Sequence, residues 1–284
     1  MARAVMGFNI LICSEAAEED SWNPDLAAAL RSAGSSVTEA HDLASARALD
    51  LASFDICLPR YRVGAAHMAC LDELLARAGM PVLNDRAARV ACENKALASF
   101  VFEERGVRQP AWLAMSSEGE VDRDVAWEGE TVVKPLCGCR GAGIEIRDSF
   151  EAAMSRARER REDVVIQELI WPARSWRVIA GRRSGTVDPY WRRPPSEADR
   201  VLSISTGSTI ARERSERVEH IAVEMLDAVG GDLLAADVLE TPDEVYALEI
   251  NHNFDAHGGT EPAAAAFLRE IEGVLARQRT PVAA

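Results

Sequence analysis

Short apolar runs alternate with helical patterns along roughly the first third of the chain. Apolar runs over residues 8–13 and 56–58, the second ending before Pro59, predict β-strands. Segments of helical composition cover residues 23–33 and 66–78, each followed by a glycine, and an extended stretch follows at residues 80–83. This alternation predicts an open α/β sheet. No G-x-G-x-x-G follows the first run, which argues against a dinucleotide-binding fold.

The middle of the chain combines a strand lysine with a glycine-rich turn. Apolar residues at helical spacing predict a helix over residues 93–105, with Gly106 as its left-handed cap. The segment TVVKPL predicts a strand that places Lys134 near its end, and CGCRGAGIEI follows it. Such glycines let the backbone approach a ligand closely, although a glycine-rich turn more often forms a plain hairpin. The segment is not a Walker loop, because its lysine precedes the glycines. A helix over residues 149–161 and a strand over 164–169 complete this part.

The last third is predicted to form an amphipathic helix and a β-hairpin. An apolar stripe indicates a helix over residues 212–229, and the runs LLAADVL and VYALEI flank a turn at residues 240–244. Side chains alternate along a strand, so Glu249 and Asn251 should share a face. Asp237 joins them only if it pairs with Glu249, because a four-residue loop without a bulge would place it on the other face.

These three side chains would offer two carboxylates and one amide oxygen to a cation. Hard oxygen ligands of this kind suit Mg²⁺, which completes its shell with water and substrate phosphates. The plain alternative is a polar strand end that faces solvent. The glycine-rich turn and the strand lysine upstream favour the metal interpretation.

Composition limits the classes of partner. The 284-residue chain has a formal net charge of −14 and a pI near 4.9, so its overall field repels nucleic acid and anionic membrane surfaces. The apolar run near the N-terminus is too short to span a membrane, and we expect a cytoplasmic protein. The six cysteines are scattered, which argues against a disulfide framework; Cys137 and Cys139 lie close together, but no second pair would complete a zinc site.

Four motifs carry a resemblance to a known family. In chain order they are ENKALASF with Lys95, TVVKPLCGCRGAGIEI with Lys134, VIQELI with Gln167 and Glu168, and LAADVL…LEINHN with Asp237, Glu249 and Asn251. Their order resembles that of the ATP-grasp carboxylate-amine ligases, in particular the RimK-like branch, over residues 54–259. The resemblance implies an α/β (α+β) ATP-grasp fold. Its parts would be an N-terminal α/β domain (1–88), a central subdomain with a glycine-rich lid loop (89–168) and a C-terminal α+β subdomain with the metal site (169–284).

The resemblance also implies a role for each matching residue. The ATP phosphates would be held by Lys95 and Lys134, under a lid loop containing Gly138, Gly141 and Gly143. The adenine would meet the backbone of Gln167, Glu168, Leu169 and Ile170. Arg177 would face the transferring phosphate and the acyl group, within a basic segment that includes Arg192, Arg193 and Arg200. One or two Mg²⁺ ions, or Mn²⁺, would be held by Asp237, Glu249 and Asn251.

Other residues are candidates for contact with the carboxylate or amine substrate. They are Arg60 at the end of the CLPR strand, Arg193, and the residues that follow the metal strand, His252, Asp255 and His257. The His252–Asp255 stretch is also similar to the N-H-x-x-x pattern of ligases that extend an amino-group carrier protein. Two positions depart from the family pattern: Ser175 replaces the acid that meets the ribose, and Leu202 stands where an asparagine precedes Gly-Gly.

The function implied is ATP-dependent ligation of a carboxylic acid, from an amino acid or peptide, to an amine. It would proceed through an acyl phosphate and release ADP and phosphate, with a carrier protein or peptide among the partners considered and a homodimer or tetramer as the expected assembly. Two alternatives stay open. One is an ATP-grasp kinase that phosphorylates a small molecule, and the other is a nucleotide-binding regulatory protein without turnover, which the two departures would allow.

Overall fold

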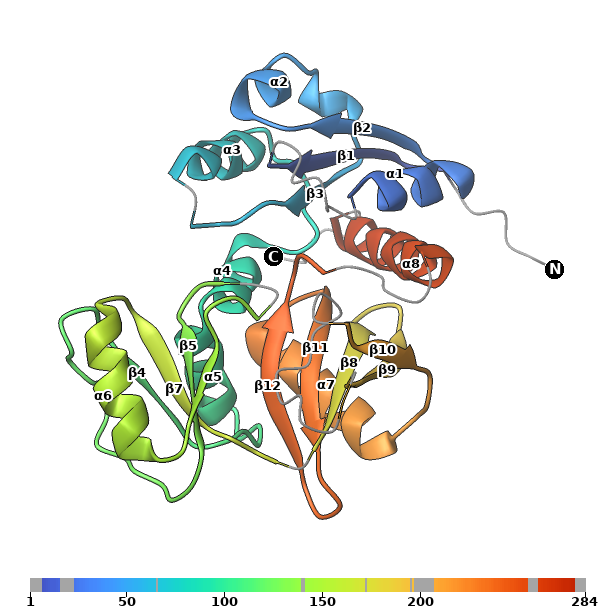
Figure 1. Ribbon diagram of the computed structural model, residues 1–284. Helices are drawn as coiled ribbons and strands as arrows, with labels where there is room; N and C mark the ends of the chain where they lie inside the picture. Colours follow the sequence, from blue (N-terminus) through green and yellow to red (C-terminus); the bar gives the residue numbers. More distant parts are fainter. Residues whose placement is uncertain are drawn as a thin grey trace, which may run out of the picture.

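Three β-sheets form the framework of the molecule (Figure 1). The computed structural model describes residues 7–15, 23–64, 66–138, 141–171, 173–194, 196, 207–254 and 260–278. The sheets have the strand orders β2-β1-β3, β4-β7-β5-β6 and β10-β9-β8-β11-β12. The mixed α/β architecture agrees with the predicted fold class.

The first sheet is parallel, as the alternation of strand and helix predicted. It contains β1 (Asn9–Ser14), β2 (Ser36–Ala40) and β3 (Ile56–Arg60), with α1 (Asn23–Ser32), α2 (Leu43–Arg47), a 3₁₀ turn (Leu51–Ser53) and α3 (Ala66–Arg77) around it. The strand that opens with the apolar run at residues 56–58 continues through Pro59 to Arg60, which agrees with the placing of Arg60 at the end of this strand. Proline has no N–H to donate, and an edge strand such as β3 tolerates it.

The predicted helix over residues 93–105 matches one helix of the structure that begins two residues later, and a second helix, which was not predicted, precedes it. In the structure α4 (Arg86–Glu93) ends and α5 (Lys95–Glu104) begins around Asn94, whose backbone is extended and whose side chain accepts from Leu97 N. Buried residues of both helices share a core with the C-terminal sheet, for example Cys92 and Phe102. By packing, therefore, these helices belong with the C-terminal sheet, whereas the predicted boundary at residue 88 groups them with the middle one.

The middle sheet is antiparallel and is covered by one helix. It contains β4 (Trp112–Met115), β5 (Thr131–Pro135), β6 (Glu145–Arg147) and β7 (Val164–Glu168). Helix α6 (Phe150–Arg160) begins after Ser149, whose hydroxyl accepts from Ala152 N, and packs Ala153 and Ala157 onto Val133 and Ile166. The glycine-rich segment is the connection between β5 and β6, as the strand assignment predicted.

The C-terminal sheet is antiparallel and has five strands. Its strands are β8 (Arg174–Gly181), β9 (Val187–Arg193), β10 (Thr209–Ala211), β11 (Leu233–Glu240) and β12 (Val245–Asn251). Helix α7 (Glu216–Val229) packs its predicted apolar stripe on one face. It begins four residues later than predicted, after the N-cap residue Ser215, and residues 209–211 pair with β9 as strand β10.

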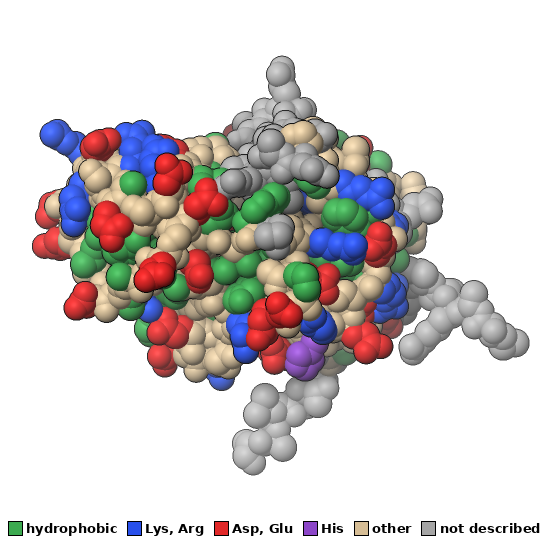
Figure 2. Space-filling view, turned by 60° about the horizontal axis from the view of Figure 1, so that its bottom comes forward, with side chains coloured by type: hydrophobic (Ala, Val, Ile, Leu, Met, Phe, Trp, Pro, Cys, Tyr) green, Lys and Arg blue, Asp and Glu red, His purple; other side chains and the backbone are tan. Residues whose placement is uncertain are grey.

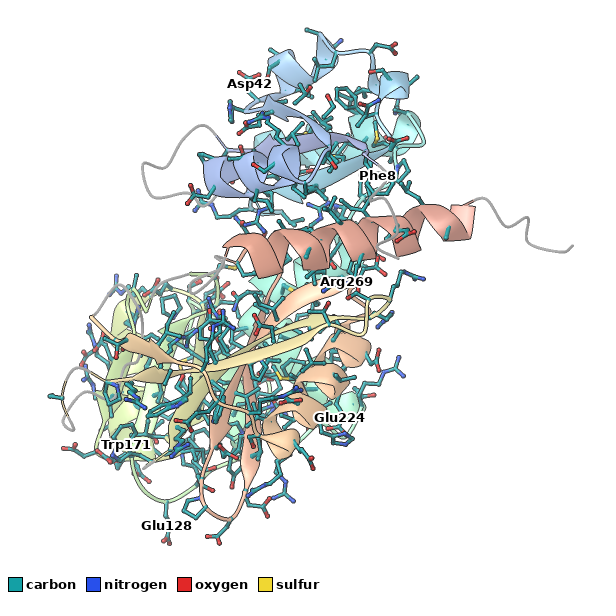
Figure 3. All side chains as sticks on the ribbon, turned by 90° about the vertical axis from the view of Figure 1, so that its right-hand side faces the viewer. Phe8, Asp42, Glu128, Trp171, Glu224 and Arg269 are labelled. Atoms are coloured by element: carbon teal, nitrogen blue, oxygen red, sulfur yellow. The ribbon has the colours of Figure 1, made fainter. Side chains whose placement is uncertain are left out.

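The last helix, α8 (Thr260–Gln278), joins two parts of the molecule. Figure 3 shows it lying between the three-stranded unit, where Phe8 is labelled, and the larger lower part, with Arg269 on the helix. Its Phe267 and Ile271 share one core with Leu26 of α1 and with Leu233 of β11. This helix was not predicted, and it covers the end of the C-terminal sheet that lies nearest the first unit.

The surface bears on the kind of ligand that the molecule can attract. Figure 2 shows one face, on which acidic and basic side chains are scattered among hydrophobic and other side chains. In the part of the chain that the structure describes, no helix is both long enough and apolar enough to cross a membrane. An anionic ligand of this acidic protein would therefore depend on a local cluster of cations.

Candidate functional site

One row of side chains crosses the C-terminal sheet from β9 to β12. The pairing places Tyr190 opposite Arg177, Arg177 opposite Asp237, and Asp237 opposite Glu249. Directly paired residues of neighbouring strands present their side chains on the same face, with the strands about 4.8 Å apart. The row therefore brings a phenol, a guanidinium and two carboxylates together. Asn251 lies two residues beyond Glu249 on the same strand.

A β-bulge makes this register. The loop between β11 and β12 has four residues, and Glu240 pairs with Val245, which by itself would set Asp237 opposite Leu248. The register shifts between Asp237 and Val238, so that Leu248 is the extra residue and Asp237 meets Glu249. Of the two registers that the sequence left open, the structure has the one that pairs Asp237 with Glu249, through the bulge that a four-residue loop requires.

Asp237 is the centre of a buried cluster of charges. Arg177 donates to both of its oxygens, from Nε to Oδ1 and from Nη2 to Oδ2 at 2.8 Å each, and Arg192 Nη2 donates to Oδ1 at 2.7 Å. Burial would raise the pKa of Asp237, but the charges of the two arginines outweigh it and hold that pKa below its usual value. The carboxylate is therefore ionised at neutral pH.

Two lysines reach the cluster from other elements. Lys95, the first residue of α5, lies 3.6 Å from Glu249 Oε1 through its Nζ and donates to the carbonyl oxygen of Gly138 at 2.9 Å. Lys134 is buried on β5 and donates to Gln167 Oε1 at 2.7 Å. Burial lowers the pKa of Lys134 to about 8, against the opposing attraction of Glu249. The middle and C-terminal sheets thus contribute cations to one place.

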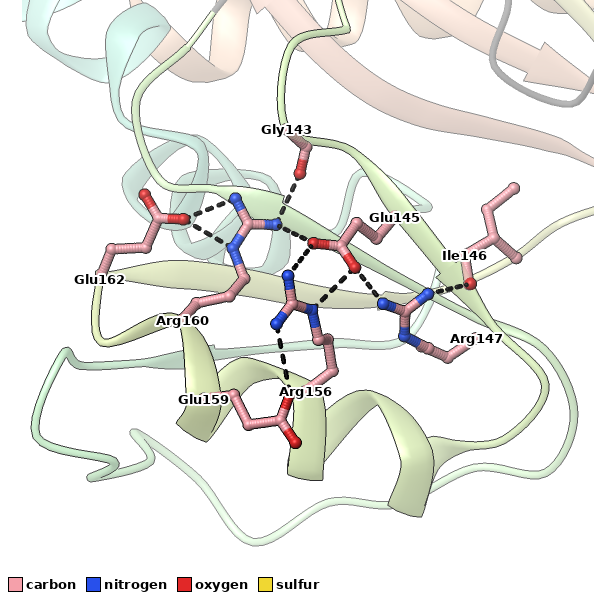
Figure 4. Close-up of polar contacts among 8 residues, drawn as sticks. All are labelled: Gly143, Glu145, Ile146, Arg147, Arg156, Glu159, Arg160 and Glu162. Carbon is pink, nitrogen blue, oxygen red and sulfur yellow. Dashed lines mark hydrogen bonds and ion pairs between the residues drawn. The ribbon is translucent and has the colours of Figure 1, made fainter.

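The glycine-rich loop is tethered at both of its described ends. At the β5 end, Lys95 holds the carbonyl of Gly138. At the β6 end, Arg160 of α6 donates to the carbonyl of Gly143 at 2.6 Å and also pairs with Glu145 (Figure 4). Gly143 has φ = 73°, and a Cβ there would lie 2.9 Å from Pro135 Cγ, so glycine is required at this position.

The predicted adenine-binding backbone is only partly available. Gln167 is paired on both sides, with Trp112 of β4 and Val132 of β5. The N–H groups of Glu168 and Leu169 donate to the carbonyls of Ala111 and Glu130. Any contact with an adenine edge would therefore come from the segment after β7, around the Leu169 carbonyl and Ile170.

His252 and Arg60 join the first sheet to the end of β12. His252 is buried, and its Nε2 lies 2.9 Å from Glu93 Oε1, while Glu93 also accepts from the backbone N–H groups of Val63 and Gly64. Arg60 donates to the carbonyls of His252 and Phe254. Burial lowers the pKa of His252, so the imidazole is neutral at physiological pH and holds the end of β12 in place.

Several predicted residues lie elsewhere. Arg193 stands on the opposite face of β9 from Arg192, with its guanidinium over Trp191 and paired with Glu213, so the structure does not bring it to the cluster. Glu168 accepts from the backbone of Ala111. Arg200, Leu202, Asp255, His257 and Cys139 lie outside the described residues. Cys137 is a free, exposed thiol.

Two residues beside the cluster were missed by sequence reasoning. Tyr190 stands two positions before Arg192 on the same strand, so the alternation that placed Glu249 and Asn251 on one face could have found it. Glu93 lies two residues before Lys95, and no local pattern connects it with His252, which is 159 residues away along the chain. A contact between residues so far apart along the chain can be found only from the tertiary structure.

The oxygen atoms of Asp237, Glu249 and Asn251 suit Mg²⁺ if phosphate oxygens supply the remaining ligands. Among the described residues, no group of three or more His, Cys, Asp and Glu side chains could hold a metal ion on its own. Asp237, Glu249 and Asn251 supply two carboxylates and an amide, and the arginines already take three hydrogen bonds at Asp237. Such a set suits a cation that takes its remaining ligands from water and substrate phosphates.

Two curated proteins are similar in sequence to this chain. It is 22% identical over 185 residues to the alpha-aminoadipate–LysW ligase LysX of Saccharolobus solfataricus, covering 62% of this chain and 66% of the relative. It is 27% identical over 191 residues to the tetrahydromethanopterin:alpha-L-glutamate ligase of Methanocaldococcus jannaschii, covering 61% and 62%. The chain thus spans less than two thirds of the length of either relative. No protein-family model matches it.

Solved structures share the fold over nearly the whole chain. The D-alanine–D-alanine ligase of Bacillus anthracis, in a complex with ATP, superposes with a TM-score of 0.69 at 13% identity, covering 95% of this chain and 97% of that one. The D-alanyl-alanine synthetase A of Vibrio cholerae gives 0.67 at 14% identity, covering 96% and 100%. The chain has the ATP-grasp fold, and these similarities confirm its resemblance to the ATP-grasp carboxylate-amine ligases.

Proposed function

We propose that this chain, which has the ATP-grasp fold, is an ATP-dependent ligase that joins a carboxylic acid to an amine. The substrate acid would belong to an amino acid or peptide, and ADP and phosphate would be released. The observation that carries the proposal is the row Arg177, Asp237 and Glu249 across the C-terminal sheet, with Lys95 and Lys134 brought to it from α5 and β5. This arrangement combines the cations that would bind a nucleoside triphosphate with the carboxylates that would bind its metal ion.

The residues around the row would act mainly by neutralising charge. A carboxylate repels the phosphates of ATP, and positively charged side chains offset that repulsion during phosphoryl transfer. Lys95 and Lys134 would hold the phosphates, and Arg177, fixed by Asp237, would face the phosphate and the acyl group. Bound Mg²⁺, held by Asp237, Glu249 and Asn251, would stabilise the charge that develops on the transferring phosphate.

The glycine-rich loop would protect an acyl phosphate from water. An activated acid hydrolyses if water reaches it before the amine does, so a loop over the site favours the amide product. Gly138 is held by Lys95, and we propose that phosphate binding to Lys95 competes with that contact. Arg160, which holds Gly143, makes no contact with the row and would keep the other end fixed.

The finer assignments belong to the same proposal. They are membership of the RimK-like branch, the use of Mg²⁺ or Mn²⁺, adenine contact around Ile170, and the domain boundaries near residues 88 and 168. A carrier protein as substrate, a homo-oligomeric assembly and a cytoplasmic location also stay predictions. The similarity to LysX, whose name gives alpha-aminoadipate and LysW, supports testing a carrier-bound amino acid among the substrates.

The proposal is tested by trapping the intermediate. The protein is incubated with ATP, Mg²⁺, hydroxylamine and a pool of amino acids and peptides, and ADP and hydroxamate are measured. We expect both products from the wild type, and a loss of about a hundredfold or more in Glu249→Gln, because the metal site loses a carboxylate. Glu244→Gln, on the loop of the same hairpin, is the matched control and should keep full activity.

Other outcomes would replace the ligase assignment. ADP with a stable phosphorylated product and no hydroxamate would indicate a kinase. Binding of ATP and Mg²⁺ without any ADP would indicate a nucleotide-binding regulatory protein, and carrier-bound substrates would then be tried before the ligase proposal is abandoned.

A further inference from the structure

Tyr190 ends the row of the candidate site with a hydroxyl group whose proton has no acceptor among the described residues. The residue is 1% exposed, and within the described part of the chain its Oη makes no hydrogen bond of regular geometry. The Arg177 guanidinium lies close enough to direct an N–H at this oxygen, but a guanidinium cannot accept the hydroxyl proton. It pairs directly with Arg177, and Arg177 in turn pairs with Asp237. A buried hydroxyl proton without an acceptor loses its hydrogen bond to water and gains none, which costs free energy.

The other buried tyrosine of the described chain shows the usual arrangement. Tyr61 is also 1% exposed, and its hydroxyl donates to Asp72 Oδ1 at 2.6 Å. Packing alone would be served as well by phenylalanine, which fills the same space without a polar atom to satisfy. A hydroxyl proton without an acceptor is therefore best explained by a partner that arrives from outside the chain.

The surroundings of Tyr190 define what that partner would be. The positive charges of Arg177 and Arg192 act on its hydroxyl group, and Asp237 binds both arginines. Burial raises the pKa of Tyr190, so that the phenol stays protonated at neutral pH and can donate. A hydroxyl donor next to two guanidinium groups fits an anionic oxygen, of a phosphate or a carboxylate.

We propose that the Tyr190 hydroxyl donates a hydrogen bond to an anionic oxygen of the substrate that Arg177 binds. This inference rests on the proposed function, because it places the reacting phosphate or acyl group beside Arg177. Tyr190 is then a catalytic residue of the ligase, and it fixes the orientation of that group from the β9 side of the row. No covalent step involves the phenol.

The test compares Tyr190→Phe with Tyr61→Phe. Each variant loses one hydroxyl from a tyrosine of equal burial, so packing is preserved in both. Thermal unfolding without ligand should show Tyr190→Phe as stable as the wild type or more stable, since a buried O–H group without an acceptor is removed, and Tyr61→Phe less stable, since a hydrogen bond is lost. A Tyr190→Phe protein as destabilised as Tyr61→Phe would overturn the inference, because its hydroxyl would have an acceptor within the chain.

The second measurement uses ligands. We expect kcat/KM of Tyr190→Phe to fall about tenfold to a hundredfold, the factor that corresponds to one hydrogen bond to a charged group, and that of Tyr61→Phe to stay near the wild type. Reduced thermal stabilisation by Mg²⁺ with a non-hydrolysable ATP analogue would assign the oxygen to the nucleotide. Unchanged nucleotide stabilisation with a raised KM for the acid, or a lowered kcat, would assign it to the acid or acyl phosphate.

Failure of the ligase proposal can be told apart from failure of this one. If the wild type makes no hydroxamate from free or carrier-bound acids, the ligase assignment fails. Tyr190 is then judged by stabilisation with the ATP analogue and with inorganic phosphate, where a smaller shift in Tyr190→Phe supports the inference. Equal shifts and equal kinetics in wild type and Tyr190→Phe overturn it, as does a wild type that neither anion stabilises.

Discussion

Two clusters of arginines around a single carboxylate lie in different parts of the molecule. At the base of the glycine-rich loop, Glu145 of β6 binds Arg147, Arg156 and Arg160 (Figure 4). In the C-terminal sheet, Asp237 of β11 binds Arg177 and Arg192. The composition of the two clusters is similar, but the exposure of the central carboxylate is not: the Glu145 side chain is 24% exposed, whereas that of Asp237 is 8% exposed.

The two clusters also differ in whether their arginines have other partners besides the central carboxylate. In the loop cluster, Arg156 also pairs with Glu159 and Arg160 with Glu162, and water reaches the group. In the sheet cluster, Asp237 is the only carboxylate paired with Arg177 and Arg192 among the described residues, and Ser175 lies at 3.4 Å from Arg192. The first cluster can serve structure alone, while the second holds cations in place that a ligand can use.

The largest predicted effect is on the buried cluster. Asp237→Asn would leave two guanidinium groups buried without a counter-charge, and we expect a loss of about 3–5 kcal/mol in the free energy of unfolding. Chemical denaturation at pH 7 measures it, and Asp243→Asn on the exposed hairpin turn is the control. A loss below about 1 kcal/mol would mean that the sheet cluster behaves like a surface ion pair, and would contradict the proposed difference between the two clusters.

A second prediction concerns the lysine beside the buried cluster. Because burial lowers the pKa of Lys134 to about 8, the free protein loses this charge as the pH rises through 8. A bound phosphate favours the charged form, so nucleotide binding should take up a proton above pH 8, and the affinity should weaken by up to about tenfold per pH unit.

Calorimetry in two buffers with different heats of ionisation counts the protons taken up. In Lys134→Arg the side chain stays charged, so any nucleotide affinity that the variant keeps should be independent of pH between 8 and 10. An equally flat profile in the wild type would show that Lys134 is not desolvated, or that it does not meet the phosphates.

The smallest effect is expected at the loop cluster. Glu145→Gln should lower the free energy of unfolding by about 1 kcal/mol or less at low salt, because its arginines keep other partners or water. The loss should shrink further in 1 M salt, where the Debye length is about 3 Å, whereas the loss in Asp237→Asn should persist. Urea titrations at two salt concentrations make this comparison, and an equal salt dependence of the two variants would contradict it.

Much of the fold could be predicted because its signals are local. The apolar runs and glycine stops located β1, α1, α3, α6 and the β11–β12 hairpin to within a few residues. Helix α4 was missed, and the predicted helix began two residues before Lys95, because Asn94 both ends α4 and caps α5. Helix α8 was also missed, since its place between two parts of the molecule follows from a core shared over long distances.

The sequence by itself determined the order of the motifs, and it placed Glu249 and Asn251 on one face, because side chains alternate along a strand. For Asp237 the sequence left two registers of the hairpin open, and only one of them places this side chain on the face of Glu249. Only the tertiary structure made that choice, through the bulge at Leu248, and set Tyr190 beside Arg177 and His252 against Glu93. Those contacts join elements far apart in the chain, and no periodicity within one element encodes which strand or helix it will meet.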